Sequence, residues 1–217
     1  MSDPLLAARM NGLVNDAIKS VDFQFQLEER GKQYRFHRYM LHHIRHRVAS
    51  DDIAVQDNPR RLQMSIAVAA YDEWNDVVYV DASKLGNKSA GFSLVHEYTH
   101  AAVDVMKYVF TRASNEGVAF LVERLAMGFG THIDHKNDPD IKGDPLAVSL
   151  FEEAEKLMMA KNLATDKTAQ ISAAEFKPLR DAVVAWYSAT LGSLFQPDQV
   201  MDSGLGVKFP SGNWKNW

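Results

Sequence analysis

The side chains whose types and spacing are best suited to metal binding and proton transfer are those of residues 96–100, His-Glu-Tyr-Thr-His. If the segment is helical, His96 and His100 lie one turn apart on one face, where two imidazole nitrogens can bind a single Zn²⁺. Glu97 lies about 100° around the helix axis, where it can accept a proton from a water molecule that the metal activates. The spacing therefore predicts metal-assisted hydrolysis with Glu97 as the general base.

The residues around this motif are apolar or small. Leu94 and Val95 precede it and Ala-Ala-Val follows it at 101–103, so that Glu97 is the one charged side chain in the stretch. A solvent-exposed helix with two ordinary histidines would be expected to carry Lys or Glu at these places. The flanks instead predict a buried helix whose polar residues have assigned partners.

Two segments resemble a known family of enzymes. Residues 94–101, Leu-Val-His-Glu-Tyr-Thr-His-Ala, resemble the active-site helix of the zincin metallopeptidases. Residues 115–119, Asn-Glu-Gly-Val-Ala, resemble the glutamate helix of the gluzincin group, which supplies the third zinc ligand. The metzincin continuation is absent, because Val103 and Met106 stand where that group has Gly and His. The resemblance covers about residues 60–125.

The resemblance implies a zinc peptidase in which His96, His100 and Glu116 bind Zn²⁺ and Glu97 is the general base. Asp104 lies one turn after His100, and is either a hydrogen-bond partner of a ligand histidine or an alternative third ligand. We prefer Glu116, because a residue from a separate helix closes a tetrahedral site more easily than three residues on one helix.

Hydrolysis of a carbonyl passes through a tetrahedral intermediate with a negatively charged oxygen, the oxyanion. The motif does not identify the side chain that stabilises it. Tyr187 and two histidines in the polar loop before residue 144, His132 and His135, are candidates. Glu123 lies two helical turns after Glu116 and is either a hydrogen-bond partner of a ligand or a surface residue.

The apolar periodicity predicts a mostly helical α+β domain that spans residues 1–217, with a small β-hairpin before the active-site helix. The predicted helices cover residues 4–21, 34–48, 92–109, 114–127, 145–162 and 173–194. The predicted strands cover residues 62–69 and 77–80, with a turn at 71–76. Zincins bind an extended peptide along the edge strand that precedes the active-site helix, so the resemblance implies a similar role for this hairpin.

Composition limits the class of protein. The chain has 217 residues, of which 46% are hydrophobic, and a net charge of −4. It can therefore bury a sizeable core, and it lacks the positive charge of a general nucleic-acid binder. Because it contains no Cys, zinc ligands must be His and carboxylate, a donor set that is typical of catalytic rather than structural zinc.

No run of 18 apolar residues is present, so the sequence predicts no membrane span. The first residues lack a basic region followed by an apolar one. We therefore expect a cytoplasmic protein, or one exported without a cleavable signal peptide, that acts on a peptide or protein substrate.

The sequence is also compatible with two functions other than hydrolysis. The chain could be a zincin-fold binding or regulatory protein with a structural or vestigial metal. It could also be a helical interaction module that works through the basic, His-rich segment at residues 35–47.

Overall fold

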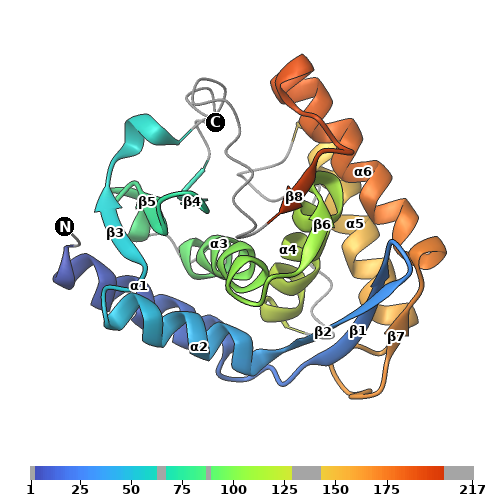
Figure 1. Cartoon of the computed structure of the whole chain (residues 1–217), viewed down its shortest axis with the longest axis horizontal. Coiled ribbons are helices and arrows are strands. Elements are labelled where there is room, and N and C mark those ends of the chain that lie inside the picture. The colour runs from blue at the N-terminus through green and yellow to red at the C-terminus, as the bar shows by residue number, and fades with distance from the viewer. Residues whose placement is uncertain (1–2, 63–66, 87–88, 129–142, 203–217) are drawn as a thin grey trace. The chain divides into compact units, whose positions relative to one another are not determined.

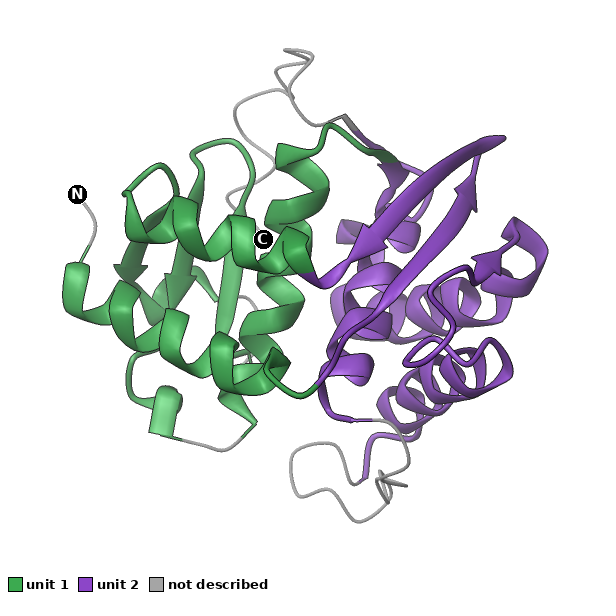
Figure 2. Cartoon of the chain, turned by 90° about the horizontal axis from the view of Figure 1, so that it is seen from below, with its two compact units in different colours: residues 1–20, 39–109, 202–217 green, residues 21–38, 110–201 purple. Residues whose placement is uncertain are grey.

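The computed structural model describes residues 3–62, 67–86, 89–128 and 143–202, which form two compact units of mixed α and β structure (Figures 1 and 2). Unit 1 comprises residues 1–20, 39–109 and 202–217, and unit 2 comprises residues 21–38 and 110–201. Each unit is therefore assembled from segments that lie far apart in the sequence. The fold confirms the α+β class.

The described residues of unit 1 form three α-helices and a three-stranded sheet. The helices are α1 (Pro4–Ile18), α2 (Arg38–Ala49) and α3 (Ala90–Val105), with short 3₁₀ helices η1 (Pro59–Arg61) and η2 (Lys84–Gly86). The strands are β3 (Ala54–Asp57), β4 (Ala69–Asp72) and β5 (Val77–Val80), in the order β3-β5-β4. β5 runs parallel to β3 and antiparallel to β4. The active-site helix predicted from sequence is α3, which packs against α1 and β4.

Local sequence explains these elements. The Asp3 carboxylate caps α1 by accepting hydrogen bonds from the backbone N–H groups of residues 5 and 6, and Pro4 occupies the first turn. The buried face of α1 comprises Leu6, Ala7, Met10, Val14 and Ile18. All four residues of β5 are buried, as expected for a central strand rich in Val and Tyr.

A close approach between α1 and α3 fixes the position of α3 within unit 1. A Cβ atom on Gly91 would lie 2.9 Å from the Leu13 carbonyl oxygen, so only glycine fits at the start of α3 without a shift. About two turns later, the fully buried Tyr98 donates its O–H to Asn11 Oδ1 at 3.0 Å. Both contacts hold the side of α3 that faces α1.

In the part of unit 2 that the structure describes, the chain forms a hairpin and three α-helices. Strands β1 (Gln24–Glu29), β2 (Lys32–His37) and β7 (Gln170–Ile171) form a sheet in the order β2-β1-β7. The helices are α4 (Arg112–Ala126), α5 (Pro145–Ala160) and α6 (Ala173–Leu191), followed by η3 (Gly192–Leu194). β6 (Val109–Thr111) and β8 (Val200–Asp202), whose residues belong mostly to this unit, form a two-stranded sheet.

The core of unit 2 lies around α4, which packs against α5 and α6. α5 begins with the Asp144 cap and Pro145, and α6 begins with a capping box between Ser172 and Glu175, as the sequence predicts. The hairpin adds aromatic packing, with Phe25 and Phe36 stacked at 5.2 Å between ring centroids.

The structure corrects three predicted elements. Residues 34–37 are strand rather than helix, because Tyr34 and Phe36 alternate inward and pair with β1. The helix predicted to run to residue 109 ends at Val105, and Lys107 then adopts a positive φ of 57° before the chain enters β6. The first hairpin strand is Ala69–Asp72, which includes two residues expected in the turn.

Some predicted features lie outside the described residues. These are strand residues 63–66, the loop with His132 and His135, and the C-terminal residues 203–217. The assignment of residues 1–217 to a single domain stays a prediction.

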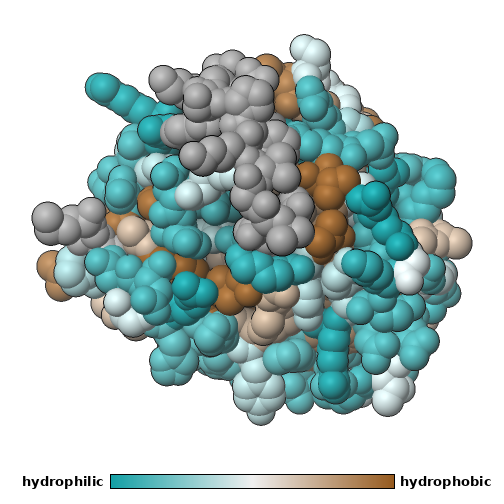
Figure 3. Space-filling view, viewed as in Figure 1, coloured by the Kyte–Doolittle hydropathy of each residue, from teal (hydrophilic) through white to brown (hydrophobic). Residues whose placement is uncertain are grey.

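Apolar side chains are mostly inside. The face shown in Figure 3 is largely hydrophilic, with hydrophobic residues in small patches. Within the described part of the chain, no helix combines the length and hydrophobicity that a membrane span requires.

The contact between α1 and α3 leads to a first prediction. Gly91→Ala should destabilise the protein by about 1–3 kcal/mol, because the new methyl group meets backbone rather than a movable side chain. Gly12→Ala is the matched control: it lies in α1 with nothing within 4 Å, and should stabilise by about 0.5–1 kcal/mol. Urea denaturation measures both, and equal effects would contradict the close approach.

Candidate metal centre

In unit 1 the two motif histidines lie side by side on α3. Their ring centroids are 4.8 Å apart and the rings meet edge to face at 76°. His96 is buried at 7% exposure and His100 is half-buried. The predicted helical spacing is therefore confirmed, and the two imidazoles are near enough for one ion to accept a nitrogen from each.

The Glu97 carboxylate is held by the edge of the sheet. Its Oε2 atom accepts a hydrogen bond of 2.8 Å from the backbone N–H of Tyr71 in β4. In an antiparallel pair of strands, hydrogen-bonded residue pairs alternate with non-hydrogen-bonded pairs. Asp81 N–H donates to the Val68 carbonyl, so Tyr71, three residues after Val68, belongs to a non-hydrogen-bonded pair. Its N–H therefore points away from β5. An N–H at the open edge of β4 therefore orients the proposed general base.

The Tyr71 side chain makes a second link between β4 and α3. Its phenol lies 2.8 Å from Asp104 Oδ2 and 2.9 Å from Asp76 Oδ1. Because a phenol has one O–H, it can donate to one carboxylate at a time, and the other can bond to the phenol only when it carries a proton. Lys107 Nζ lies 4.0 Å from the other oxygen of Asp104. Asp104 thus ties the end of α3 to β4.

Burial changes the proton affinity of this pair. Desolvation raises the pKa of Asp104 above its usual value, and the nearby Asp76 adds to the rise, against the opposing effects of Tyr71 and Lys107. The pKa of the Tyr71 phenol is also raised, first by burial and then by the charge of Asp104. Asp104 is consequently an acid that holds its proton to higher pH than a surface aspartate.

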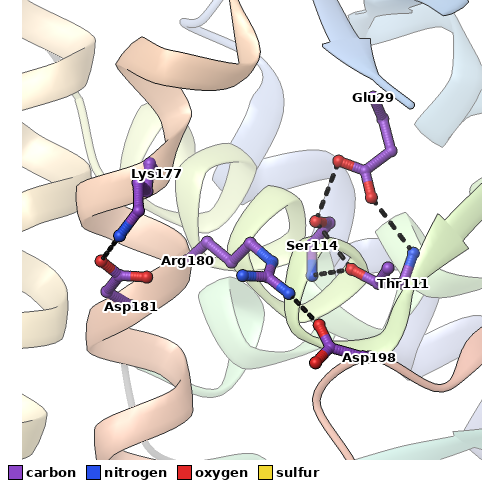
Figure 4. Close-up of polar contacts among 7 residues, drawn as sticks. All are labelled: Glu29, Thr111, Ser114, Lys177, Arg180, Asp181 and Asp198. Atoms are coloured by element: carbon purple, nitrogen blue, oxygen red, sulfur yellow. Dashed lines mark hydrogen bonds and ion pairs between the residues drawn. The ribbon is translucent and has the colours of Figure 1, made fainter. Parts of the chain in front are cut away.

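Glu116 lies in unit 2 on α4. Every residue of α4 is buried except Glu116, which is half-buried. The start of the helix is held by the Thr111 cap and by the buried carboxylate of Glu29 at the end of β1, which accepts bonds from Ser114 Oγ at 3.1 Å and Thr111 N–H at 3.4 Å (Figure 4). A carboxylate is favourable there, since a helix N-terminus carries partial positive charge.

The Glu116 side chain is bonded within its own unit. The Tyr187 phenol on α6 donates to Glu116 Oε2 at 2.7 Å. Tyr187 is one of the three candidates for the oxyanion donor, and in this structure its O–H is directed to the Glu116 carboxylate. Glu123, two turns later, is buried at 6% exposure, so the structure excludes the interpretation of it as a surface residue.

The other two polar contacts in Figure 4 involve side chains of α6. Lys177 pairs with Asp181, and Arg180 pairs with Asp198. Lys177, Asp181 and Asp198 are largely exposed and Arg180 is half-buried, so both pairs are at the surface and contribute little to stability.

The residues expected at the site therefore fall into two groups. Unit 1 brings together His96, His100 and Glu97, and unit 2 fixes Glu116 beside Tyr187. Sequence analysis missed Tyr71, which it placed in a turn. The apolar run before Asp72 could have been continued into a strand, but the charged residues after it favoured a turn.

Comparisons with known proteins add no assignment: no family model matches the chain, and neither a curated protein nor a solved structure matches it. The likeness to zincins therefore rests on the two motifs and on the arrangement of their side chains within each unit.

The raised pKa of Asp104 leads to a second prediction. A raised folded-state pKa stabilises the fold below the ordinary value of 3.8, and this contribution is lost as the pH rises through the folded-state pKa. Asp104→Asn has no such titration. The free energy of unfolding of the variant minus that of the wild type should therefore increase as the pH rises from 4 towards 7.

Urea denaturation of the two proteins in the presence of a chelator gives this difference. Asp16→Asn is the control, because Asp16 forms an exposed pair with Lys19 that contributes little to stability. A difference for Asp104→Asn that is constant with pH would contradict the shifted pKa.

Proposed function

We propose that this protein is a zinc-dependent hydrolase of the gluzincin type that cleaves peptide bonds. Zn²⁺ is bound by His96, His100 and Glu116, and Glu97 is the general base. The donor set of two imidazoles and one carboxylate suits zinc and is typical of catalytic sites.

One observation carries this proposal. The two histidines share a face of a buried helix, while Glu97 on the same helix is held by a main-chain N–H of the adjacent strand. This arrangement suits a cation shared by the two imidazoles and a carboxylate base with a fixed orientation on the same helix.

The reaction would use these residues as follows. Zinc, when bound, polarises the substrate carbonyl and makes water acidic enough to attack it. Glu97 takes the proton of the attacking water and then delivers it to the leaving amine. The N–H of Tyr71 holds Glu97 Oε2, so the carboxylate does not have to be reoriented between these two transfers.

The peptide substrate follows from the gluzincin likeness. The position of β4 supports it, because this strand is at one end of the order β3-β5-β4 and contacts α3. An extended peptide could pair with its outer edge, next to Glu97.

Metal content tests the ligand set. Wild-type protein should bind about one zinc per chain, and His96→Ala and Glu116→Ala should lose it, since each removes one of three protein ligands. Asp104→Asn should keep the metal, and His43→Ala, an exposed residue of α2, is the control. Elemental analysis after dialysis measures the zinc. A zinc-free wild type would overturn the proposal, and loss in Asp104→Asn with retention in Glu116→Ala would move the third ligand.

A separate variant tests the chemistry. Glu97→Gln should retain zinc and lose roughly 10²–10⁴-fold in the rate of cleavage of fluorescently labelled casein, because the amide cannot accept the proton. The alternative, a zincin-fold binding or regulatory protein with a structural metal, predicts zinc in both proteins and hydrolysis in neither.

A further inference from the structure

We infer that Tyr187 is the positioning residue of the Glu116 carboxylate and thereby raises the affinity of the protein for zinc. This inference rests on the proposed function, because it takes Glu116 to be a ligand. It assigns Tyr187 a role different from the oxyanion donor that sequence analysis considered.

The contact has the geometry of a strong hydrogen bond. The phenol O–H meets Glu116 Oε2 at 2.7 Å, a distance typical of a hydroxyl that donates to an ionised carboxylate. A carboxylate offers about four acceptor positions on its two oxygens. It can therefore accept the phenol and bind a cation at the same time.

Orientation matters here because glutamate has a flexible side chain. Glu116 is the one residue of α4 that is not buried, so packing restricts it less than its neighbours. Fixing such a side chain on binding costs conformational entropy. A phenol that holds the carboxylate before the ion arrives removes part of this cost.

Tyr187 is itself held rigidly. Its ring stacks on Phe195 with centroids 4.9 Å apart and planes at 17°, and it meets Trp186 edge to face at the same distance. Phe195 is buried and lies under the Arg112 guanidinium, which is 4.9 Å from the ring centroid. The phenol oxygen therefore has little freedom to leave Glu116.

The sequence next to Glu116 allows α4 and α6 to approach. A Cβ atom on Gly117 would lie 2.9 Å from Cζ of Phe176, a buried residue near the start of α6. Without a side chain at 117, the two helices pack closely enough for a tyrosine on α6 to reach the preceding residue on α4. The glycine that follows Glu116 therefore has a structural role in unit 2, because it allows α6 to approach α4.

The test is the zinc affinity of Tyr187→Phe, measured by competition with a chromophoric chelator. Phenylalanine keeps the aromatic stacking and removes only the hydroxyl, so the dissociation constant should rise about 10–100-fold, the usual effect of losing the partner of a metal ligand. Tyr39→Phe is the control, because Tyr39 is 65% exposed on α2 and should leave the affinity unchanged.

Two further measurements separate positioning from general stability. The Co²⁺-loaded variant should show an altered visible spectrum, since the carboxylate is no longer oriented, whereas a purely structural loss would leave the spectrum as in wild type. In a Glu116→Gln background, Tyr187→Phe should cause less than a threefold further loss of zinc affinity, because its effect passes through the carboxylate.

The outcomes are distinguishable from those of the proposed function. A wild type that binds no zinc overturns both proposals. A wild type that binds zinc through Glu116, with unchanged affinity and spectrum in Tyr187→Phe, overturns the positioning role and leaves the hydrolase proposal in place.

Discussion

The constraint on which this structure depends is the burial of polar side chains on helix α3. His96, Thr99 and Asp104 are all buried on a helix that packs against α1 and β4. A buried polar group without a partner is costly, so each must find one. Thr99 bonds back to the carbonyl of Val95, and Asp104 bonds to Tyr71. The two histidines meet each other, which is what a shared cation would require.

Tyr71 makes two contacts with α3, one through its main chain and one through its side chain. Its main-chain N–H orients Glu97 and its phenol binds Asp104, so one residue of β4 fixes two points on α3 that are seven residues apart. Strand and helix are thereby held in register next to the proposed general base. Such preorganisation is valuable in catalysis, because a group already in place needs no reorientation during the reaction.

Helix α4 shows a related arrangement in unit 2. Its N-terminus is anchored by Thr111 and Glu29, and Gly117 allows α6 to approach closely enough for Tyr187 to reach Glu116. In both units, therefore, a tyrosine from a neighbouring element holds a carboxylate that the zincin likeness marks as functional.

The sequence by itself determined the helices with strong periodicity and clear caps, and the face that His96 and His100 share. These features depend on local geometry: the 3.6-residue repeat, the capping of α5 and α6, and an i, i+4 spacing. Only the tertiary structure decided that residues 34–37 form a strand, that Tyr71 belongs to β4, and that Tyr187 bonds to Glu116. Strand pairing and contacts between helices join residues far apart in the chain, such as the 71 positions between Glu116 and Tyr187, and no local pattern encodes them.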